Sequence, residues 1–425
     1  MLCAISTTSE IGALNTYSNY KNVVRLAEPD WNHAETSGLS GLTVDVIGPN
    51  RLIDQQGREL HHFCTTSYLG LDYHPALLEG ATEALQSSGT LRIANSRNRS
   101  KLSLLEKFES ELSTLFESEC MATLSCSSAS AGALPLLAAG IFTNEISPTM
   151  VFDKHSHYSM NHLKAACADE TEVITLMHND IDQLEQLCKT HRHVAYIADG
   201  LYSMGGSADM DSLLYLKERY GLFLYLDDSH AISAFGERGS GYVRAKISEM
   251  DSGTIIVASL AKSFGASGGV IMLGNKQHRS YLNRYGGPCN WSQSLNAAAI
   301  GAGIASIRLH HSTELDSLQA SLLRNIRLFD SLVASEQSGH PTAIRLIRCG
   351  EPQVATEAAS HLADHGFFTS TVFFPVVPRG KAAVRITLRA DMSPALIRKF
   401  CSCLKAFLDE NNLNTITSNN KSSSP

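Results

Sequence analysis

The sequence lacks the features that would point to a membrane, to secretion or to nucleic acid. No apolar run approaches the roughly 18 residues that a membrane-spanning helix needs, so we expect no span. The first 30 residues hold no basic start followed by an apolar stretch, so we expect no secretory signal. The net charge is −7 and no basic tract stands out, which argues against a nucleic-acid partner.

Paired cysteines are also lacking. The ten cysteines are scattered, no CxxC pair recurs, and no histidine cluster joins Cys401 and Cys403 in the sequence. Regular pairs would indicate a disulfide framework or a zinc site. We therefore expect reduced cysteines, no metal site and a cytoplasmic protein.

The composition is typical of a globular protein, with 43% hydrophobic and 18% charged residues. A chain of 425 residues is too long for one simple core. We expect an N-terminal arm with short strands (1–60), a large α/β domain (61–290), a C-terminal α+β domain (291–410) and a polar tail (411–425). The arm is expected to pack on a partner subunit, and residues 44–60 to form two short strands around a turn.

Apolar, β-rich runs alternate with helical patterns through the middle of the chain. The runs cover residues 150–153, 172–176, 194–198, 222–227, 254–258 and 269–273, and the helical patterns include 180–188 and 211–220. Such strands, separated by helices, predict an α/β fold with a mostly parallel central sheet covered by helices on both faces. From about residue 291 we expect a long helical stretch to 334, strands at 343–348 and 383–388, and a helix over 394–408.

In sheets of this kind ligands bind beyond the carboxyl ends of the strands, so polar residues there are candidates for a site. Lys262 follows one strand in the segment SLAKSFGASGG. Ser259 and Ser263 can donate hydrogen bonds to a phosphate, and the glycines allow the backbone to come close. A buried lysine with a lowered pKa can form an imine with an aldehyde cofactor. A lysine in a surface loop is the alternative that its position alone allows.

Asp227 ends another strand, and His230 follows three residues later. The ring of pyridoxal 5′-phosphate (PLP) needs a carboxylate beside its pyridine nitrogen, because ion pairing keeps that nitrogen protonated. Asp227 is the candidate for this position, and His230 and Ser203 are candidates for a contact with the ring hydroxyl. The alternative for Asp227 is a helix N-cap.

Two further groups follow strands. Ser127 and Ser128 open a helical run whose first backbone amides form an anion site, although simple capping accounts for the serines equally well. His157 follows the run at 150–153. It could stack on a cofactor ring or be a half-buried histidine with satisfied hydrogen bonds.

Together these pieces resemble the α-oxoamine synthases, a PLP-dependent family with the type I fold of aspartate aminotransferase. The resemblance covers about residues 44–408. The segment 67–71 (SYLGL), followed by His74 and Pro75, is similar to an early segment of the family, and the later motifs match in order. The matching positions are His157, Ser203, Asp227, His230, Ser259, Lys262, Ser292 and Arg385.

The resemblance implies a role for each matching residue. Lys262 would hold PLP as a Schiff base and act as general base, and Asp227 would pair with the pyridine nitrogen. His157 would stack on the ring, and Arg385 would bind the carboxylate of the substrate, for which a bidentate guanidinium is suited. The remaining contacts with the hydroxyl or phosphate would come from His230, Ser203, Ser127, Ser128, Ser259 and, across a homodimer interface, Ser292.

The implied reaction is a decarboxylative condensation of an amino acid with an acyl thioester, giving an α-aminoketone. The segment ASLAKSF, and DSH in place of DAH, resemble the branch that makes quorum-sensing autoinducers. A PLP-dependent aminotransferase on the same fold and a non-catalytic partner subunit are the alternatives. The amino acid stays open, as does the acyl donor, which could be acyl-CoA or an acyl-carrier protein.

The sequence departs from the family pattern around the substrate pocket. Thr66 lies in a block where the family usually has asparagine, which makes it a candidate for substrate contact. Cys126 replaces the glycine of a phosphate-binding segment, Arg97 lies in a replaced stretch (94–99), and Asn296 begins the dipeptide that replaces a proline pair. These changes predict a pocket modified for a different substrate.

Overall fold

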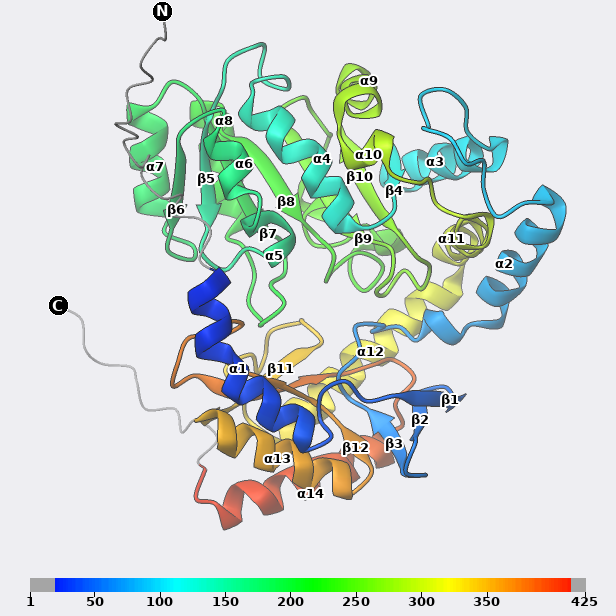
Figure 1. Ribbon diagram of the computed structural model, residues 1–425, viewed down its shortest axis with the longest axis vertical. Helices are drawn as coiled ribbons and strands as arrows, with labels where there is room; N and C mark the ends of the chain where they lie inside the picture. Colours follow the sequence, from blue (N-terminus) through cyan, green and yellow to red (C-terminus); the bar gives the residue numbers. More distant parts are fainter. Residues whose placement is uncertain (1–19, 414–425) are drawn as a thin grey trace, which may run out of the picture.

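A computed structural model describes residues 20–413 and contains a large sheet with helices above a smaller part with two small sheets (Figure 1). The large sheet has seven strands in the order β4-β10-β9-β8-β7-β5-β6. Their bounds are β4 (Glu119–Thr123), β5 (Thr149–Asp153), β6 (Val173–Leu176), β7 (Val194–Asp199), β8 (Phe223–Asp227), β9 (Thr254–Ser259) and β10 (Gly269–Leu273). Only β10 is antiparallel to its neighbours, so the prediction of a mostly parallel sheet is confirmed.

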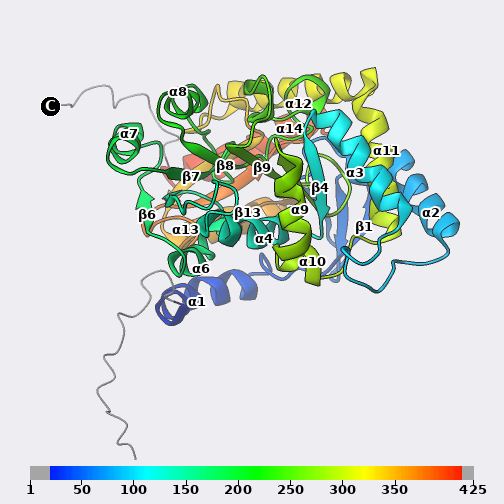
Figure 2. The same ribbon diagram turned by 90° about the horizontal axis from the view of Figure 1, so that it is seen from above.

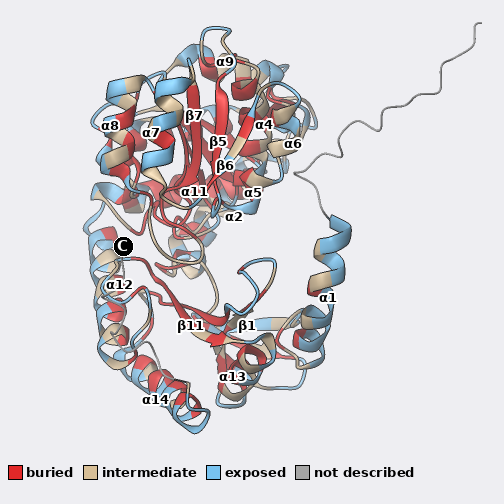
Figure 3. Ribbon diagram, turned by 90° about the vertical axis from the view of Figure 1, so that its left-hand side faces the viewer, coloured by how far each residue is buried: buried red, intermediate tan, exposed pale blue. Residues whose placement is uncertain are grey.

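Alternate residues of each strand face two separate apolar cores. On β8, Leu224 and Leu226 join one core, whereas Phe223 and Tyr225 join the other. The first core is covered by α3 (Ser103–Phe116), α7 (Ile181–Thr190), α8 (Met210–Tyr220) and α11 (Ala297–His310). The second is covered by α4 (Cys126–Ala138), α6 (Lys164–Ala168), α9 (Lys276–Tyr285) and α10 (Pro288–Trp291), next to the short α5 (Tyr158–Asn161). Figure 2 shows the sheet between these layers, and Figure 3 shows that its strands are buried.

The smaller part combines segments from both ends of the chain. One sheet has the order β1-β2-β3-β12, from β1 (Val44–Gly48), β2 (Arg51–Asp54), β3 (Glu59–His62) and β12 (Phe367–Phe368). The other has the order β11-β14-β13, from β11 (Ile344–Gly350), β13 (Ser370–Val372) and β14 (Ala382–Thr387). Around them lie α1 (Tyr20–Thr36), α12 (Thr313–Leu332), α13 (Pro352–Asp364) and α14 (Pro394–Glu410), whereas α2 (Pro75–Ser88) packs on α11.

Several local predictions were wrong. Residues 119–123 were not predicted as a strand, because the run is short and lies between helices, yet β4 forms the edge of the large sheet. Residues 44–62 form three strands instead of two, since the turn at Gly57 returns the chain once more. The helical stretch 291–334 contains separate helices, because α11 ends at His310 and Ser312 caps α12.

The N-terminal arm was expected to contact a partner subunit, and its described part, α1, packs on α13 of the same chain (Figure 1). Trp31 of α1 meets Phe373 edge to face, with ring centroids 5.1 Å apart. Residues 1–19, and the tail from residue 414, lie outside the described residues. Because β3 pairs with β12 and α11 packs on α3, we propose that the two parts divide near residues 62 and 311. Between residues 20 and 413, we find no helix with the length and apolar character to cross a bilayer.

A buried ion pair ties β11 to α12. The guanidinium of Arg345 is fully buried and donates to Asp330 from Nε (2.6 Å) and Nη2 (2.7 Å). It also donates to the backbone carbonyls of Thr342, Ile344 and His340. All of its donors therefore have partners, as a buried charge requires.

We predict that Arg345→Met destabilises the protein by about 3 kcal/mol, because breaking a buried pair leaves a carboxylate and several carbonyls without a donor. Urea unfolding measures the change. Arg348→Met is the matched control on the same strand, since Arg348 pairs with Glu336 at a more exposed position and its loss costs about 1 kcal/mol or less. Equal effects of the two substitutions would contradict the role of the buried pair.

Candidate active site

Acidic residues end three neighbouring strands of the large sheet. The carboxyl ends of these strands lie together along one side of the sheet, which we call the strand edge. Asp153 ends β5, Asp199 ends β7 and Asp227 ends β8, and all three are buried. Asp199 lies directly opposite Asp227 in the parallel pairing. Burial, and then the neighbouring Asp227 carboxylate, raise the pKa of Asp199 well above its usual value. A buried group of this kind at a strand edge marks the place where a cation or a polar ligand is stabilised.

Lys262 lies in the turn that follows β9, at the same edge. Its Nζ atom is 3.0 Å from Nε2 of His230. Burial lowers the pKa of the Lys262 amine below its ordinary value, and the negative charge of Asp227 opposes this shift. Lys262 is partly buried, and its amine lies within hydrogen-bond distance of a buried histidine, which argues against the surface-loop alternative.

His230 links Lys262 to a tyrosine that the sequence analysis quoted but gave no role. Its Nδ1 atom is 2.6 Å from the hydroxyl of Tyr68, which is 1% exposed. Burial lowers the pKa of His230 well below its usual value, and the charges of Lys262 and Arg385 add to this. Burial also raises the pKa of Tyr68 to about 12. Near neutral pH a neutral imidazole thus lies between an amine and a protonated phenol.

The carboxylate of Asp227 is held from two sides. Its Oδ1 accepts a hydrogen bond from the backbone N–H of Ser229 (2.9 Å), and its Oδ2 accepts one from the Cys126 thiol (3.3 Å). The hydroxyl of Ser229 donates to Cys126 Sγ (3.6 Å) and accepts from the backbone N–H of Ser259 (2.8 Å). A turn follows β8 here, so the helix N-cap alternative for Asp227 is wrong. These bonds fix the direction in which the carboxylate faces.

Ser127 and Ser128 occupy the first turn of α4, which starts at the same edge as the strand ends. Ser125 is the N-cap, with its hydroxyl accepting from the backbone N–H of Ser128 (3.1 Å). Ser127 is exposed, and the N-cap is Ser125 instead of Ser127. Gly269 lies against this turn, and a Cβ atom there would come within 2.6 Å of the Cys126 nitrogen. The glycine therefore allows β10 to lie close to the helix start.

His157 begins the short α5, next to the Asp199 carboxylate. Its backbone N–H donates to Asp199 Oδ1 (2.9 Å), and its Nδ1 accepts from the N–H of Ser159 (3.2 Å). Burial lowers the pKa of His157, and Lys262 adds to the shift while Asp227 opposes it. His157 is thus within the electric field of the two residues that the sequence assigned to the cofactor.

Arg385 belongs to the smaller part, and its side chain reaches the strand edge of the large sheet. It lies on β14, is 7% exposed, and donates from Nε to the backbone carbonyl of Ser203 in the loop after β7 (2.9 Å). Its positive charge opposes the effect of burial on the pKa of Tyr68. Two of the predicted residues, Ser203 and Arg385, are therefore in direct contact although they come from different parts of the molecule.

Other predicted residues are not joined to this cluster. Among the described residues, no side-chain hydrogen bond links Ser292 or Thr66 to it, and the Ser292 hydroxyl donates to the carbonyl of Pro288. Their roles stay predictions. Arg97, from the replaced stretch, is buried and pairs with Glu109 (2.5 Å). A cavity of about 490 Å³ is lined by Arg97 of this pair. None of the predicted site residues lines it, so its size does not identify it as the active site.

Sequence reasoning left out Tyr68, Cys126 and Ser229 as contacts. Tyr68 lies in the SYLGL segment, but its partner His230 is 162 residues away in the chain. Cys126 was noted only as the replacement of a glycine, and its bond to Asp227 spans 101 residues. Ser229 lies between two assigned residues in the DSH motif. Tyr68 and Ser229 could have been found because they lie inside matching motifs, and Cys126 because it replaces a family glycine.

Comparison with known proteins agrees with the resemblance predicted from the motifs. The chain is 28% identical over 356 residues to an 8-amino-7-oxononanoate synthase of Thermoanaerobacter pseudethanolicus, covering 81% of this chain and 86% of that one. It is 25% identical over 375 residues to the mitochondrial 2-amino-3-ketobutyrate coenzyme A ligase of Mus musculus, covering 85% and 86%. These relatives are α-oxoamine synthases, so the predicted family resemblance is confirmed.

Solved structures agree on the fold. A serine palmitoyltransferase from S. paucimobilis superposes with a TM-score of 0.80 at 18% identity, covering 92% of this chain and all of that chain. An 8-amino-7-oxononanoate synthase from Francisella tularensis gives a TM-score of 0.67 at 17% identity, covering 83% and 99%. Residues 58–404 match the family described as aminotransferase class I and II. With most of its length matched, this chain belongs to the aminotransferase class I and II family.

Proposed function

We propose that this chain is a PLP-dependent acyltransferase that condenses an amino acid with an acyl thioester, with loss of carbon dioxide. The observation that carries the proposal is the Lys262 amine within hydrogen-bond distance of the buried His230, at the strand edge where Asp227 is held in place. The relatives are synthases and ligases of this chemical class, which supports the same reaction here. The acyl donor is acyl-CoA or an acyl-carrier protein.

The donor set at the edge fits PLP. Lys262 offers an amine for the aldehyde, Asp227 a fixed carboxylate for the pyridine nitrogen, and His230 and Ser203 polar groups for the ring hydroxyl. The phosphate fits the first backbone amides of α4 and the hydroxyls of Ser127, Ser128 and Ser259. The hydroxyl of Ser263 is buried without a hydrogen-bond partner, as expected beside a ligand. When bound, PLP supplies an electron sink for negative charge at the substrate α-carbon.

Lys262, His230 and Tyr68 form the route for a proton. A lowered pKa favours the neutral amine of Lys262, which can remove the α-proton of an amino acid. His230 contacts that amine through Nε2 and Tyr68 through Nδ1, so either ring nitrogen can carry its single proton. Because the pKa of Tyr68 is about 12, its hydroxyl keeps its proton and holds His230 in position.

Arg385 is placed to bind the substrate carboxylate. Its Nε is already used by the carbonyl of Ser203, which fixes the plane of the guanidinium. A guanidinium is suited to a bidentate contact with a carboxylate. His157 is exposed beside Asp199, and it would stack on the ring and polarise the carbonyl of the acyl donor.

Two accompanying features belong to the proposal. A homodimer with a shared site would give Ser292 its role, because the chain offers it no polar side-chain partner within the described site. A cytoplasmic location fits the nine described cysteines, all of which are free thiols. The second candidate function is amino transfer, which the name of the matching family favours. A non-catalytic subunit is not favoured, because Lys262, Asp227, His230 and Arg385 are all present.

We predict that borohydride fixes PLP covalently to Lys262, and that Lys262→Ala lowers turnover by about 10²- to 10⁴-fold because the general base is lost. Mass spectrometry of the digested protein locates the label, and the visible chromophore is recorded before and after reduction. Label on another lysine, or a purified protein without chromophore, would show the assignment to be wrong.

We predict that thiol is released only when an amino acid and an acyl thioester are both present. A panel of amino acids and acyl-CoA chain lengths is offered, free thiol is followed with a chromogenic disulfide, and products are identified by mass spectrometry. Acyl-carrier-protein thioesters form a second panel. Transfer of the amino group to pyruvate without thiol release would replace this function by the aminotransferase alternative.

We predict that Tyr68→Phe lowers kcat roughly 5- to 100-fold, because a buried imidazole nitrogen loses its partner. It should also shift the pH dependence of kcat, since His230 is no longer held in one orientation, while KM changes little. Tyr225→Phe is the control: Tyr225 is buried on β8 and its hydroxyl bonds Ser130 on the other side of the sheet. The two variants should lose similar stability, and equal losses of kcat would exclude a positioning role for Tyr68.

A further inference from the structure

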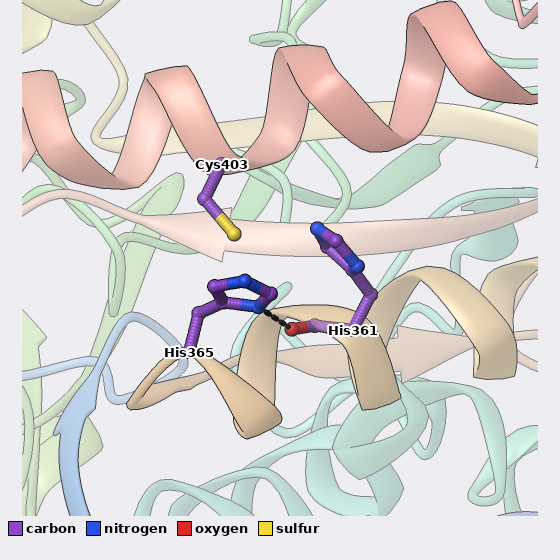
Figure 4. A group of neighbouring side chains, drawn as sticks. All are labelled: His361, His365 and Cys403. Atoms are coloured by element: carbon purple, nitrogen blue, oxygen red, sulfur yellow. Dashed lines mark hydrogen bonds between the residues drawn. The ribbon is translucent and has the colours of Figure 1, made fainter.

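Two histidines and a cysteine converge between α13 and α14, in the smaller part of the molecule. His361 lies on α13, His365 follows one turn later at the end of that helix, and Cys403 lies on α14. Figure 4 shows the three side chains facing one another in the gap between the helices. One ligand atom from each residue lies within 4.8 Å of the other two. The sequence analysis expected no metal site, because these histidines come 38 and 42 residues before Cys403.

His365 is fixed in the ring form that a metal ion requires. Its Nδ1 is 2.7 Å from the backbone carbonyl of His361, one turn earlier. A carbonyl oxygen only accepts, so Nδ1 carries the proton and the lone pair of the neutral ring is on Nε2. Metal-binding histidines almost always use one ring nitrogen in this way, because the bond sets the ring orientation and strengthens the other nitrogen as a ligand.

One ring nitrogen of His361 has no hydrogen-bond partner. Its Nε2 is buried and has no hydrogen-bond partner. The ring packs against Phe407, with centroids 5.4 Å apart, and against His365, at 4.5 Å. A buried polar atom without a partner is uncommon and calls for an ion or a water molecule beside it. The position of His361 therefore points to a ligand, independently of how the three residues cluster.

Cys403 brings a sulfur atom to the group, and a cysteine binds metal ions as the thiolate. Burial raises the pKa of its thiol, and the ammonium of Lys399, one turn earlier on α14, opposes that shift. Lys399 is itself held over the ring of Phe367, 5.7 Å from the centroid. The exposed Asp364, next to His365, supplies a negative charge at the rim. A bound divalent cation would replace the thiol proton, as it does in other cysteine sites.

We propose that His361, His365 and Cys403 bind a divalent metal ion of the zinc class, which ties α13 to α14. Two imidazole nitrogens and one thiolate suit Zn²⁺ and not the oxygen-seeking Mg²⁺ or Ca²⁺. Bond lengths of about 2.0–2.3 Å in a tetrahedron put the ligand atoms roughly 3.5 Å apart. Small rotations of the side chains close the remaining distance, and water completes the fourth position.

The site would fasten the last described helix to the body of the molecule. β13 and β14 lie in the sequence between the two helices that the ion joins, so the ion closes a loop around them. The apolar face of α14, which includes Phe400 and Leu404, already packs into the core of the smaller part. Cys403 lies beside this face, so the ion would add a metal-ligand link between the two helices, next to their apolar contact.

The test counts metal ions in the holoenzyme. Purified protein is treated with a chelator and dialysed against limiting Zn²⁺, and bound zinc is measured by mass spectrometry. The wild type should hold one more equivalent than His365→Gln or Cys403→Ser, and Zn²⁺ should raise its Tm by several degrees but not theirs, because only the wild type gains a ligand of the folded state. Co²⁺ should give a thiolate charge-transfer band that Cys403→Ser lacks.

Cys188→Ser is the matched control, because Cys188 is also a half-buried free thiol but lies on α7. It should keep the extra zinc and the rise in Tm. The PLP chromophore of each variant reports that it is folded, since no residue of the proposed metal site contacts the strand edge that holds the cofactor. Equal zinc content in the wild type, His365→Gln and Cys403→Ser would overturn the proposal.

Discussion

The rest of the site depends on two linked hydrogen-bond contacts, one between Lys262 and His230 and one between His230 and Tyr68. They connect an amine, an imidazole and a phenol inside the protein. Burial lowers the pKa of the amine and that of the imidazole, and it raises the pKa of the phenol. Each shift favours the uncharged form of its group. In these uncharged forms the three groups place no second full charge beside the Asp227 carboxylate.

The contacts of the site also join the two parts of the molecule. Lys262 and His230 follow strands of the large sheet, whereas Tyr68 packs into the core of the smaller part. Arg385, on β14, reaches the same edge through the carbonyl of Ser203. The positions of these groups thus depend on packing in two separate cores. A small rotation of one part relative to the other would lengthen the contact between Arg385 and Ser203.

Long apolar strands made the large sheet predictable. The runs that became β5, β7, β8, β9 and β10 were identified to within about two residues, and the rule that ligands bind at carboxyl ends then selected Asp227 and Lys262. The rest depends on contacts between distant segments. β4 is short and gains its stability from β10, about 150 residues later, and Tyr68 gained a role only beside His230. The convergence of His361 and Cys403 likewise depends on how two helices pack, which no local pattern encodes.

The pairing of β3 with β12 has a consequence for the order in which the protein is made. On the side of β3 that faces away from β2, residues 61 and 62 pair with residues 367 and 368. During synthesis the N-terminal strands therefore leave the ribosome long before the edge that completes their sheet exists. The large sheet faces a shorter delay, because β5 to β9 pair with neighbours close in the chain. Contacts of such wide sequence separation form slowly, so the smaller part is expected to assemble last, onto a large part that is already folded.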